Sequence, residues 1–351
     1  MENKALQDWS KFKFGRVITE EELSRRTHPV WPYRYFNPGQ PVEPAQVDEI
    51  LKGVIDSHVH GAPLGAWLAG RPAMTDTCVK ASQAGLKALV FKDHNTWTVN
   101  AAIVIQEMLA KLKKEKEAKG EVFNPVEVYG GVTLNNTVGG LNPQVVEIAL
   151  GYGRCKEIWL PSLDARHQKA AMGLDGGIQI TEGNELVPPM KKILEILHDY
   201  NNNRKGDRCA LGACHVSNEE KVALLDYIKA KGLDVDVIID HCTQELTIVT
   251  PEEAREMLEK GAYLQFCECS CIPWPGMQDW VVAFDYSINL IKDLIKEKGP
   301  DHLILATDAG QPGNEPVIGW WHFLRILMSQ GVKEEHINVM AKEVPARILG
   351  I

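Results

Sequence analysis

The chain lacks any apolar run long enough to cross a bilayer: none of its 351 residues lies in a segment approaching the roughly 20 apolar residues that a transmembrane helix needs. It also lacks a hydrophobic signal core near Met1, so we expect a cytoplasmic protein whose eight cysteines are free thiols. It has no basic stripe, and its net charge of −9 argues against nucleic acid as a partner. These absences leave a small-molecule substrate as the expected partner, with no membrane involved.

The first strand-like segment is not followed by a Gly-x-Gly-x-x-Gly turn, which removes support for a dinucleotide-binding open sheet. Strand-like and helix-like segments instead alternate along most of the chain. The eight strand-like segments are 54–60, 88–93, 126–132, 157–161, 210–215, 235–241, 263–267 and 303–308. This alternation predicts a (β/α)8 TIM barrel, with an open doubly wound sheet as the alternative.

Residues 1–50 lack strand periodicity and contain several aromatic residues, among them Trp9 and Trp31. We interpret them as an N-terminal extension that packs on a barrel formed by residues 51–351, or that mediates a homo-oligomer. The connection 164–188 is unusually long for a loop between a strand and a helix. It is expected either to cover the active-site face or to be a surface insertion.

Two histidines, His58 and His60, stand one residue apart at the end of the first predicted strand. Residues i and i+2 of a strand point to the same face, so both imidazoles can aim at one point. At the carboxyl end of a barrel strand, such a pair can hold a metal ion.

Further polar residues follow the other predicted strands, where barrel enzymes carry out their chemistry. They are Lys92, Asp93 and His94 after the second strand, Asp164 and His167 after the fourth, His215 after the fifth, Asp240 and His241 after the sixth, and Asp308 after the eighth. Four imidazoles and a carboxylate suit a divalent metal, zinc first and manganese as a possibility, as one or two ions.

This order of strand-end residues resembles the amidohydrolase superfamily, and within it the phosphotriesterase-like branch. Three passages carry the likeness: Ile55-Asp56-Ser57-His58-Val59-His60, then Ala213-Cys214-His215-Val216-Ser217-Asn218-Glu219-Glu220 with Ile239-Asp240-His241, and Leu305-Ala306-Thr307-Asp308-Ala309-Gly310. The resemblance implies that His58 and His60 bind the more buried ion and that His215 and His241 bind the more exposed one. It also implies that Asp308 ligates metal and accepts a proton from the attacking water.

One feature departs from the family pattern, which takes a carboxylated lysine from strand four to bridge two metals. Here Lys156 lies at the beginning of that strand, the wrong end. Lys92, after Leu89-Val90-Phe91, is the best-placed substitute, because a buried amine can react with carbon dioxide to form an anionic carbamate. The alternatives are a rim lysine paired with an aspartate, Asp164 as the bridge, or a mononuclear site.

The sequence therefore predicts a metal-dependent hydrolase that acts on an amide, ester, lactone or related carbon centre. His94, Asp164 and His167 are the predicted substrate contacts. A metal-dependent decarboxylase of the same superfamily and an inactive binding barrel are the alternatives. Asp56 is interpreted as either a partner of a ligand histidine or a strand-start residue, and Asp240 as structural.

Overall fold

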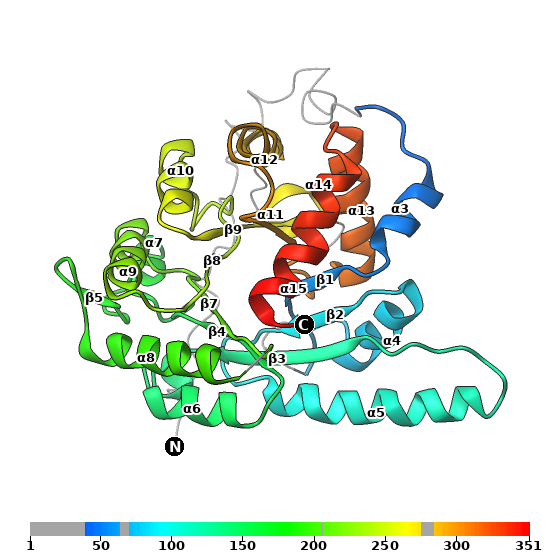
Figure 1. The fold of residues 1–351 in the computed structure, drawn as a ribbon, viewed down its shortest axis with the longest axis horizontal. Helices are drawn as coiled ribbons and strands as arrows, with labels where there is room; N and C mark the ends of the chain where they lie inside the picture. Colours follow the sequence, from blue (N-terminus) through cyan, green and yellow to red (C-terminus); the bar gives the residue numbers. More distant parts are fainter. Residues whose placement is uncertain (1–38, 64–69, 205, 275–283) are drawn as a thin grey trace.

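The computed structural model describes residues 39–63, 70–204, 206–274 and 284–351 (Figure 1). The aromatic residues of the predicted extension lie outside the described residues. The part of it that is described includes α3 (Pro44–Leu51), which lies beside α13 (Pro316–Ser329). There Trp321 Nε1 donates a hydrogen bond to Asp48 Oδ1 at 3.0 Å. In the described part of the chain, no helix combines the length and the apolar character needed to span a membrane.

The sheet consists of eight parallel strands in the order β1-β2-β3-β4-β7-β8-β9-β10. Their bounds are β1 Ile55–Val59, β2 Ala88–Phe91, β3 Glu127–Thr133, β4 Cys155–Trp159, β7 Ala210–Gly212, β8 Val237–Ile239, β9 Tyr263–Cys267 and β10 Leu303–Ala306. The first and last strands meet where His60 N donates to Ala309 O at 2.7 Å and Asp308 N donates to His58 O at 2.8 Å. The predicted (β/α)8 barrel is therefore confirmed, and the open sheet is wrong.

Helices follow the strands and cover the outside of the barrel (Figure 1). Besides α3 and α13 they are α4 Met74–Ala84, α5 Val99–Glu117, α6 Pro143–Gly151, α8 Pro188–Asn203, α9 Asn218–Lys231, α10 Pro251–Glu259, α12 Phe284–Lys298, α14 Glu334–Asn338 and α15 Val344–Leu349. The helices α9 and α10 begin with a capping box: Ser217 pairs with Glu220, and Thr250 pairs with Glu253. Each box satisfies backbone N–H groups that the first helical turn leaves unpaired.

The long connection after β4 contains structure of its own. It forms the short helix α7 (Arg166–Ala171) and then a two-stranded antiparallel hairpin, β5 (Thr181–Glu182) with β6 (Glu185–Leu186). A second short helix, α11 (Glu268–Cys271), follows β9 directly. Both short helices bring side chains to the carboxyl ends of the strands, as described below.

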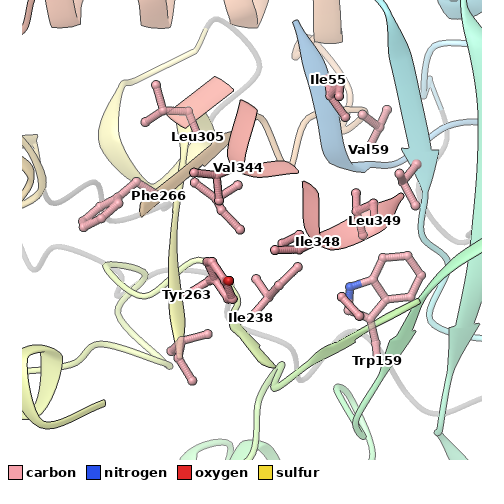
Figure 2. Close-up of a cluster of buried hydrophobic side chains, with 14 of the residues drawn as sticks. Ile55, Val59, Trp159, Ile238, Tyr263, Phe266, Leu305, Val344, Ile348 and Leu349 are labelled. Carbon is pink, nitrogen blue, oxygen red and sulfur yellow. The ribbon is translucent and has the colours of Figure 1, made fainter. Parts of the chain in front are cut away.

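The amino ends of the strands pack on the C-terminal helices. Figure 2 shows Ile348 and Leu349 of α15 in the same buried apolar cluster as Ile55, the first residue of β1, and α15 contacts this strand. At this end Lys156 donates to Gly350 O at 3.0 Å and pairs with Asp207 at 2.8 Å. Lys156 therefore lies at the end of the barrel opposite the strand-end histidines, as its position at the start of β4 predicts.

The barrel interior holds the indole of Trp159, at the end of β4. A Cβ atom on Gly212 of the neighbouring strand β7 would lie 2.4 Å from Trp159 Cδ1 and 2.5 Å from Glu157 Oε1. Real Cβ contacts are longer than this, so Gly212 leaves the space that the indole occupies. The Trp159 ring therefore lies inside the barrel next to the strand-end residues: its centroid is 6.0 Å from that of the His58 ring.

Candidate metal centre

Three of the strand ends carry non-glycine residues in the left-handed backbone region. The φ angles are +38° at Cys214, +32° at His241 and +50° at Asp308. Such conformations cost about 1–3 kcal/mol each and are typical of functional sites, where the surrounding structure holds them in place. These turns aim His215, His241 and Asp308 from three separate strands toward one place above the barrel.

The imidazole of His58 is held in one tautomer by a buried glutamine. Its Nδ1 lies 3.0 Å from Gln265 Oε1, an amide oxygen that can only accept, so Nδ1 carries the proton. The same Oε1 accepts from the thiol of Cys267, while Gln265 Nε2 donates to Ser57 Oγ, which fixes the orientation of the amide. Nε2 of His58 is left with a free lone pair and has no hydrogen-bond partner among the described residues.

His241 and His215 are held in the same way. The hydroxyl of Thr247 donates to His241 O at 2.9 Å, so its oxygen accepts from His241 Nδ1 at 2.9 Å. Gln168 Oε1, from α7, accepts from His215 Nδ1 at 2.7 Å. In the neutral rings both Nε2 atoms are therefore unprotonated, yet they lie only 3.2 Å apart. Two lone pairs this close repel each other unless a cation lies between them, and two nitrogen ligands of tetrahedral zinc are separated by about 3.3 Å.

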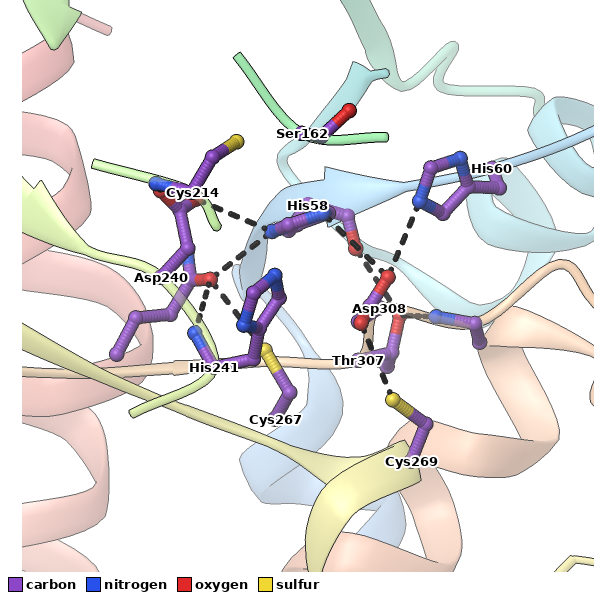
Figure 3. A network of polar contacts seen from close by, with 12 residues as sticks. His58, His60, Ser162, Cys214, Asp240, His241, Cys267, Cys269, Thr307 and Asp308 are labelled. Atoms are coloured by element: carbon purple, nitrogen blue, oxygen red, sulfur yellow. Dashed lines mark hydrogen bonds and ion pairs between the residues drawn. The ribbon is translucent and has the colours of Figure 1, made fainter. Parts of the chain in front are cut away.

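Asp308 lies across the cluster from these two rings. Its Oδ1 is 3.1 Å from His60 Nε2 and 3.4 Å from His58 Nε2, and its Oδ2 accepts from the Cys269 thiol at 3.2 Å (Figure 3). One ligand atom each from His58, His241 and Asp308 fall within 4.8 Å of one another. The predicted ligands from β1, β7, β8 and β10 thus form one continuous cluster.

Burial sets the protonation of this cluster. It lowers the pKa of His60 to about 3, against the opposing effect of Asp308, and it lowers the pKa of His241 to about 3 as well. Burial acts to raise the pKa of Asp308, but the neighbouring His58 and His60 outweigh it and hold that pKa well below its usual range. Neutral imidazoles and an ionised carboxylate are the forms that bind a metal.

Lys92 reaches the interior of the barrel from the end of β2. It is fully buried, and its Nζ lies 5.6 Å from the centroid of the Trp159 ring. Nζ makes no hydrogen bond to nitrogen or oxygen within the described part of the chain. Burial acts to lower the pKa of Lys92, but Cys214, Asp240 and Asp308 raise it overall. In the protein without metal, Lys92 is therefore a buried ammonium ion that makes no hydrogen bond to a nitrogen or oxygen atom of the described residues.

Asp240 belongs to the site, whereas its alternation along the strand predicted a purely structural role. Its Oδ1 lies 3.4 Å from His58 Nδ1, and its Oδ2 accepts from Cys214 N at 2.7 Å. Beside it, Glu157 is fully buried, and both of its carboxylate oxygens lack partners among the described residues. Burial and the charge of Asp240 raise the pKa of Glu157, so Glu157 is protonated and Asp240 ionised.

The three predicted substrate contacts lie at different places. His94 stacks on His60, with ring centroids 5.2 Å apart and an angle of 23° between the planes. Asp164 and His167 are not brought into the cluster. Asp164 accepts from Asn136 N and pairs with Lys169, while His167 Nε2 lies 2.9 Å from Leu246 O. Their polar atoms hold the loop after β4 in place, which explains their positions at the rim.

Several residues that orient the ligands are absent from the sequence prediction. Gln265 has a readable signal, because a glutamine inside the apolar strand Tyr263–Cys267 needs a buried polar partner. Gln168 and Thr247 have none, since Gln168 comes from the short helix α7 within the connection after β4 and Thr247 comes from the loop after β8. Asp56 contacts no imidazole ring: it accepts from Thr307 Oγ1 at 2.6 Å and from Trp320 Nε1 at 2.7 Å, joining β1 to the end of β10.

The strands and helices form a (β/α)8 barrel whose strand-end histidines and Asp308 gather at one end. Solved structures with this fold include an organophosphorus hydrolase from Deinococcus radiodurans, which is 16% identical with a TM-score of 0.54, covering 88% of this chain and 94% of that one. A mutant PTE-like lactonase from the same organism is 16% identical with a TM-score of 0.52, covering 88% and 98%. No curated protein sequence matches the chain.

A family model also matches, over residues 53–265. The chain belongs to the Family of unknown function (DUF6282). The matched segment includes four of the five predicted histidine and aspartate ligands and ends before Asp308.

Proposed function

We propose that this protein is a metal-dependent hydrolase that acts on an ester, lactone, amide or related carbon centre of a small molecule. The observation that carries the proposal is the cluster of His58 and His241 with a buried carboxylate, Asp308, together with the unprotonated Nε2 of His215 only 3.2 Å from that of His241. Without a cation this arrangement places lone pairs against one another in a buried site. The named structural relatives include a hydrolase and a lactonase, which supports the same reaction class by analogy.

The donor set fits one or two divalent ions. His58, His60 and Asp308 would hold one ion, and His215 with His241 would hold a second. Imidazole nitrogen with a single carboxylate suits zinc, and manganese also accepts these ligands. A divalent metal bound there would lower the pKa of a water molecule, so that hydroxide would be available as a nucleophile near neutral pH.

Asp308 is the proposed general base. One oxygen faces His60 at 3.1 Å, and the other is held by the Cys269 thiol at 3.2 Å, so the carboxylate cannot rotate freely. Because its pKa is held low, Asp308 is ionised and able to take the proton of the attacking water. It then gives that proton to the leaving group.

Carboxylation of Lys92 is part of the proposal. Its ammonium would first lose one proton, and the free Nζ would then bond to the carbon of carbon dioxide and lose a second proton. This reaction would convert a buried cation into an anion able to bridge two ions. Nuclear magnetic resonance after incubation with zinc and ¹³C-bicarbonate should show a carbamate carbon. Lys92→Ala should remove that signal. Lys221→Met is the matched control, because Lys221 is also fully buried but has its Nζ bonded to Asn218.

The hydrolase proposal is tested by metal analysis and by a panel of chromogenic esters, lactones and anilides. Asp308→Asn should lower kcat by about 10²–10⁴-fold, the usual contribution of a general base. Asp164→Asn is the control, because Asp164 lies on the same face but is engaged by Asn136 and Lys169. Purified protein that binds neither zinc nor manganese would refute the proposal.

Metal-dependent decarboxylation is the second candidate, and the charge of Lys92 favours it. A lysine that stays cationic beside Asp240 and Asp308 provides no anionic bridge between two ions. One ion per chain, no carbamate signal and carbon dioxide release from an aromatic or unsaturated acid would favour this reaction over hydrolysis.

A further inference from the structure

A second polar cluster adjoins the metal centre and joins the ends of three strands. It consists of His94 after β2, Asn135 after β3 and Ser162 after β4. Ser162 and Asn135 are buried, whereas His94 is only partly buried. In Figure 3, Ser162 lies apart from the contacts that surround Asp308. The cluster is therefore separate from the network that orients the metal ligands.

The amide of Asn135 has only one orientation that satisfies its neighbours. Two backbone N–H groups, those of Ser162 and Asp164, donate to its Oδ1 at 2.9 and 3.2 Å. Its Nδ2 then donates to His94 O and to Ser162 Oγ, both at 2.8 Å. Reversing the amide would set donor against donor at the two backbone groups.

This orientation determines the direction of the next hydrogen bond. Ser162 Oγ accepts from Asn135, and His94 Nδ1, 2.7 Å away, is the one acceptor among the described residues that its own hydrogen can reach, so the hydroxyl donates to Nδ1. Nδ1 of His94 is therefore an acceptor, and the proton of the neutral ring is on Nε2. This is the reverse of His58, His215 and His241, whose Nδ1 atoms donate.

The ring of His94 lies between the two halves of the metal centre. Its centroid is 5.2 Å from that of His60 and 6.2 Å from that of His215. A histidine with a proton on Nε2 has no lone pair there to offer a metal ion. The ring therefore carries an N–H donor beside both groups of proposed ligands.

We propose that His94 is a catalytic hydrogen-bond donor that stabilises the oxyanion of the substrate, with Ser162 and Asn135 as its positioning residues. This role rests on the proposed hydrolase function. As the oxygen of the attacking water bonds to the carbonyl carbon, the π electron pair of the C=O bond moves onto the carbonyl oxygen. That oxygen accepts from His94 Nε2–H, and His94 keeps its proton. The C=O bond re-forms as the bond to the leaving group breaks, and the leaving group takes the proton that Asp308 received from the water.

The tautomer is tested directly by ¹⁵N nuclear magnetic resonance of the full-length, zinc-loaded protein labelled at histidine. The His94 signal, assigned by its loss in His94→Gln, should show a protonated Nε2 and an unprotonated Nδ1. Ser162→Ala should abolish this single-tautomer pattern while leaving the His58 signal unchanged. A protonated Nδ1 in the wild-type protein, or coordination of Nε2 by zinc, would overturn the proposal.

The donor role is tested with methylphosphonate, a tetrahedral anion that resembles the oxyanion, by calorimetry on the same zinc-loaded protein. His94→Leu should weaken binding by at least about tenfold, whereas His94→Gln, which keeps an N–H donor, should bind within about threefold of wild type. Equal binding by His94→Leu and wild type would overturn the role. If an ester of the panel is hydrolysed, His94→Leu should lower kcat by about 10²–10³-fold with little change in KM. If the wild type hydrolyses none, the proposed function fails, and the tautomer and phosphonate results still decide the donor role.

Discussion

Replacing Thr247 by Val should weaken the half of the metal centre formed by His215 and His241. Valine has nearly the same shape as threonine, so the substitution removes the hydroxyl and leaves little cavity. Thr247 is 2% exposed, and its hydroxyl is the partner of His241 Nδ1 at 2.9 Å. Without it, the buried N–H is left unsatisfied, at a cost of about 1–3 kcal/mol, or the proton moves to Nε2 and occupies the lone pair that binds metal.

Loss of a group that orients a metal ligand lowers metal affinity by about 10–100-fold, or about 1.4–2.7 kcal/mol. We therefore expect Thr247→Val to raise the Kd of the weaker zinc ion by that factor and to leave the ion held by His58, His60 and Asp308 in place. Competition with a chromophoric chelator measures both affinities. Thr77→Val is the matched control, because the buried Thr77 hydroxyl has no hydrogen-bond partner in the described structure. Unchanged zinc affinity in Thr247→Val would refute the assignment of the His241 tautomer.

Two further predictions concern stability. In chelator-treated protein, the free energy of unfolding should fall as the pH falls from about 6.5 toward 3. The reason is that His60 and His241 have a pKa of about 3 in the folded chain, so they bind protons at a higher pH in the unfolded chain than in the folded one. Burial also lowers the pKa of His94 and His215, and these two groups reinforce the trend. Buried carboxyls oppose it, because their folded pKa is raised: to about 6 for Asp56, to about 8 for Glu268, and well above the usual value for Glu157. Denaturant titrations at pH 7 and pH 5 will measure the balance. Gly212→Ala should lower the free energy of unfolding by about 1–3 kcal/mol, because it overpacks the barrel interior. Gly151→Ala is the control: nothing lies within 4 Å of the added Cβ, so its stability should be unchanged or slightly higher. Equal melting temperatures for the two variants would contradict this prediction.

The barrel was predictable because its strands and their polar ends are local features of the sequence. A short β-branched run followed by His58-x-His60 indicates a buried strand that ends in a pair of ligands. The same pattern recurs at Asp240-His241 and at Asp308, so the sequence alone gives both the sheet and the edge at which the site forms.

The groups that orient the ligands were less predictable because they depend on tertiary contacts. Gln168 meets His215 only because the long connection after β4 folds back as α7, and Thr247 meets His241 from a loop six residues along the chain. The role of Asp240 was missed because side chains alternate between the two faces of a sheet only as long as the strand stays extended. The left-handed turn at His241 breaks that alternation.

In the proposed metal-dependent enzyme, the left-handed turns at His241 and Asp308 make metal binding and fold stability compete with each other. Glycine adopts these backbone angles without strain, so at His241 and Asp308 a more stable backbone is open only to a chain that gives up a ligand. Cys214 carries the same strain with no ligand to lose. Relief of backbone strain at His241 or Asp308 would therefore weaken the proposed site. The trade-off between activity and stability falls on these particular strand ends.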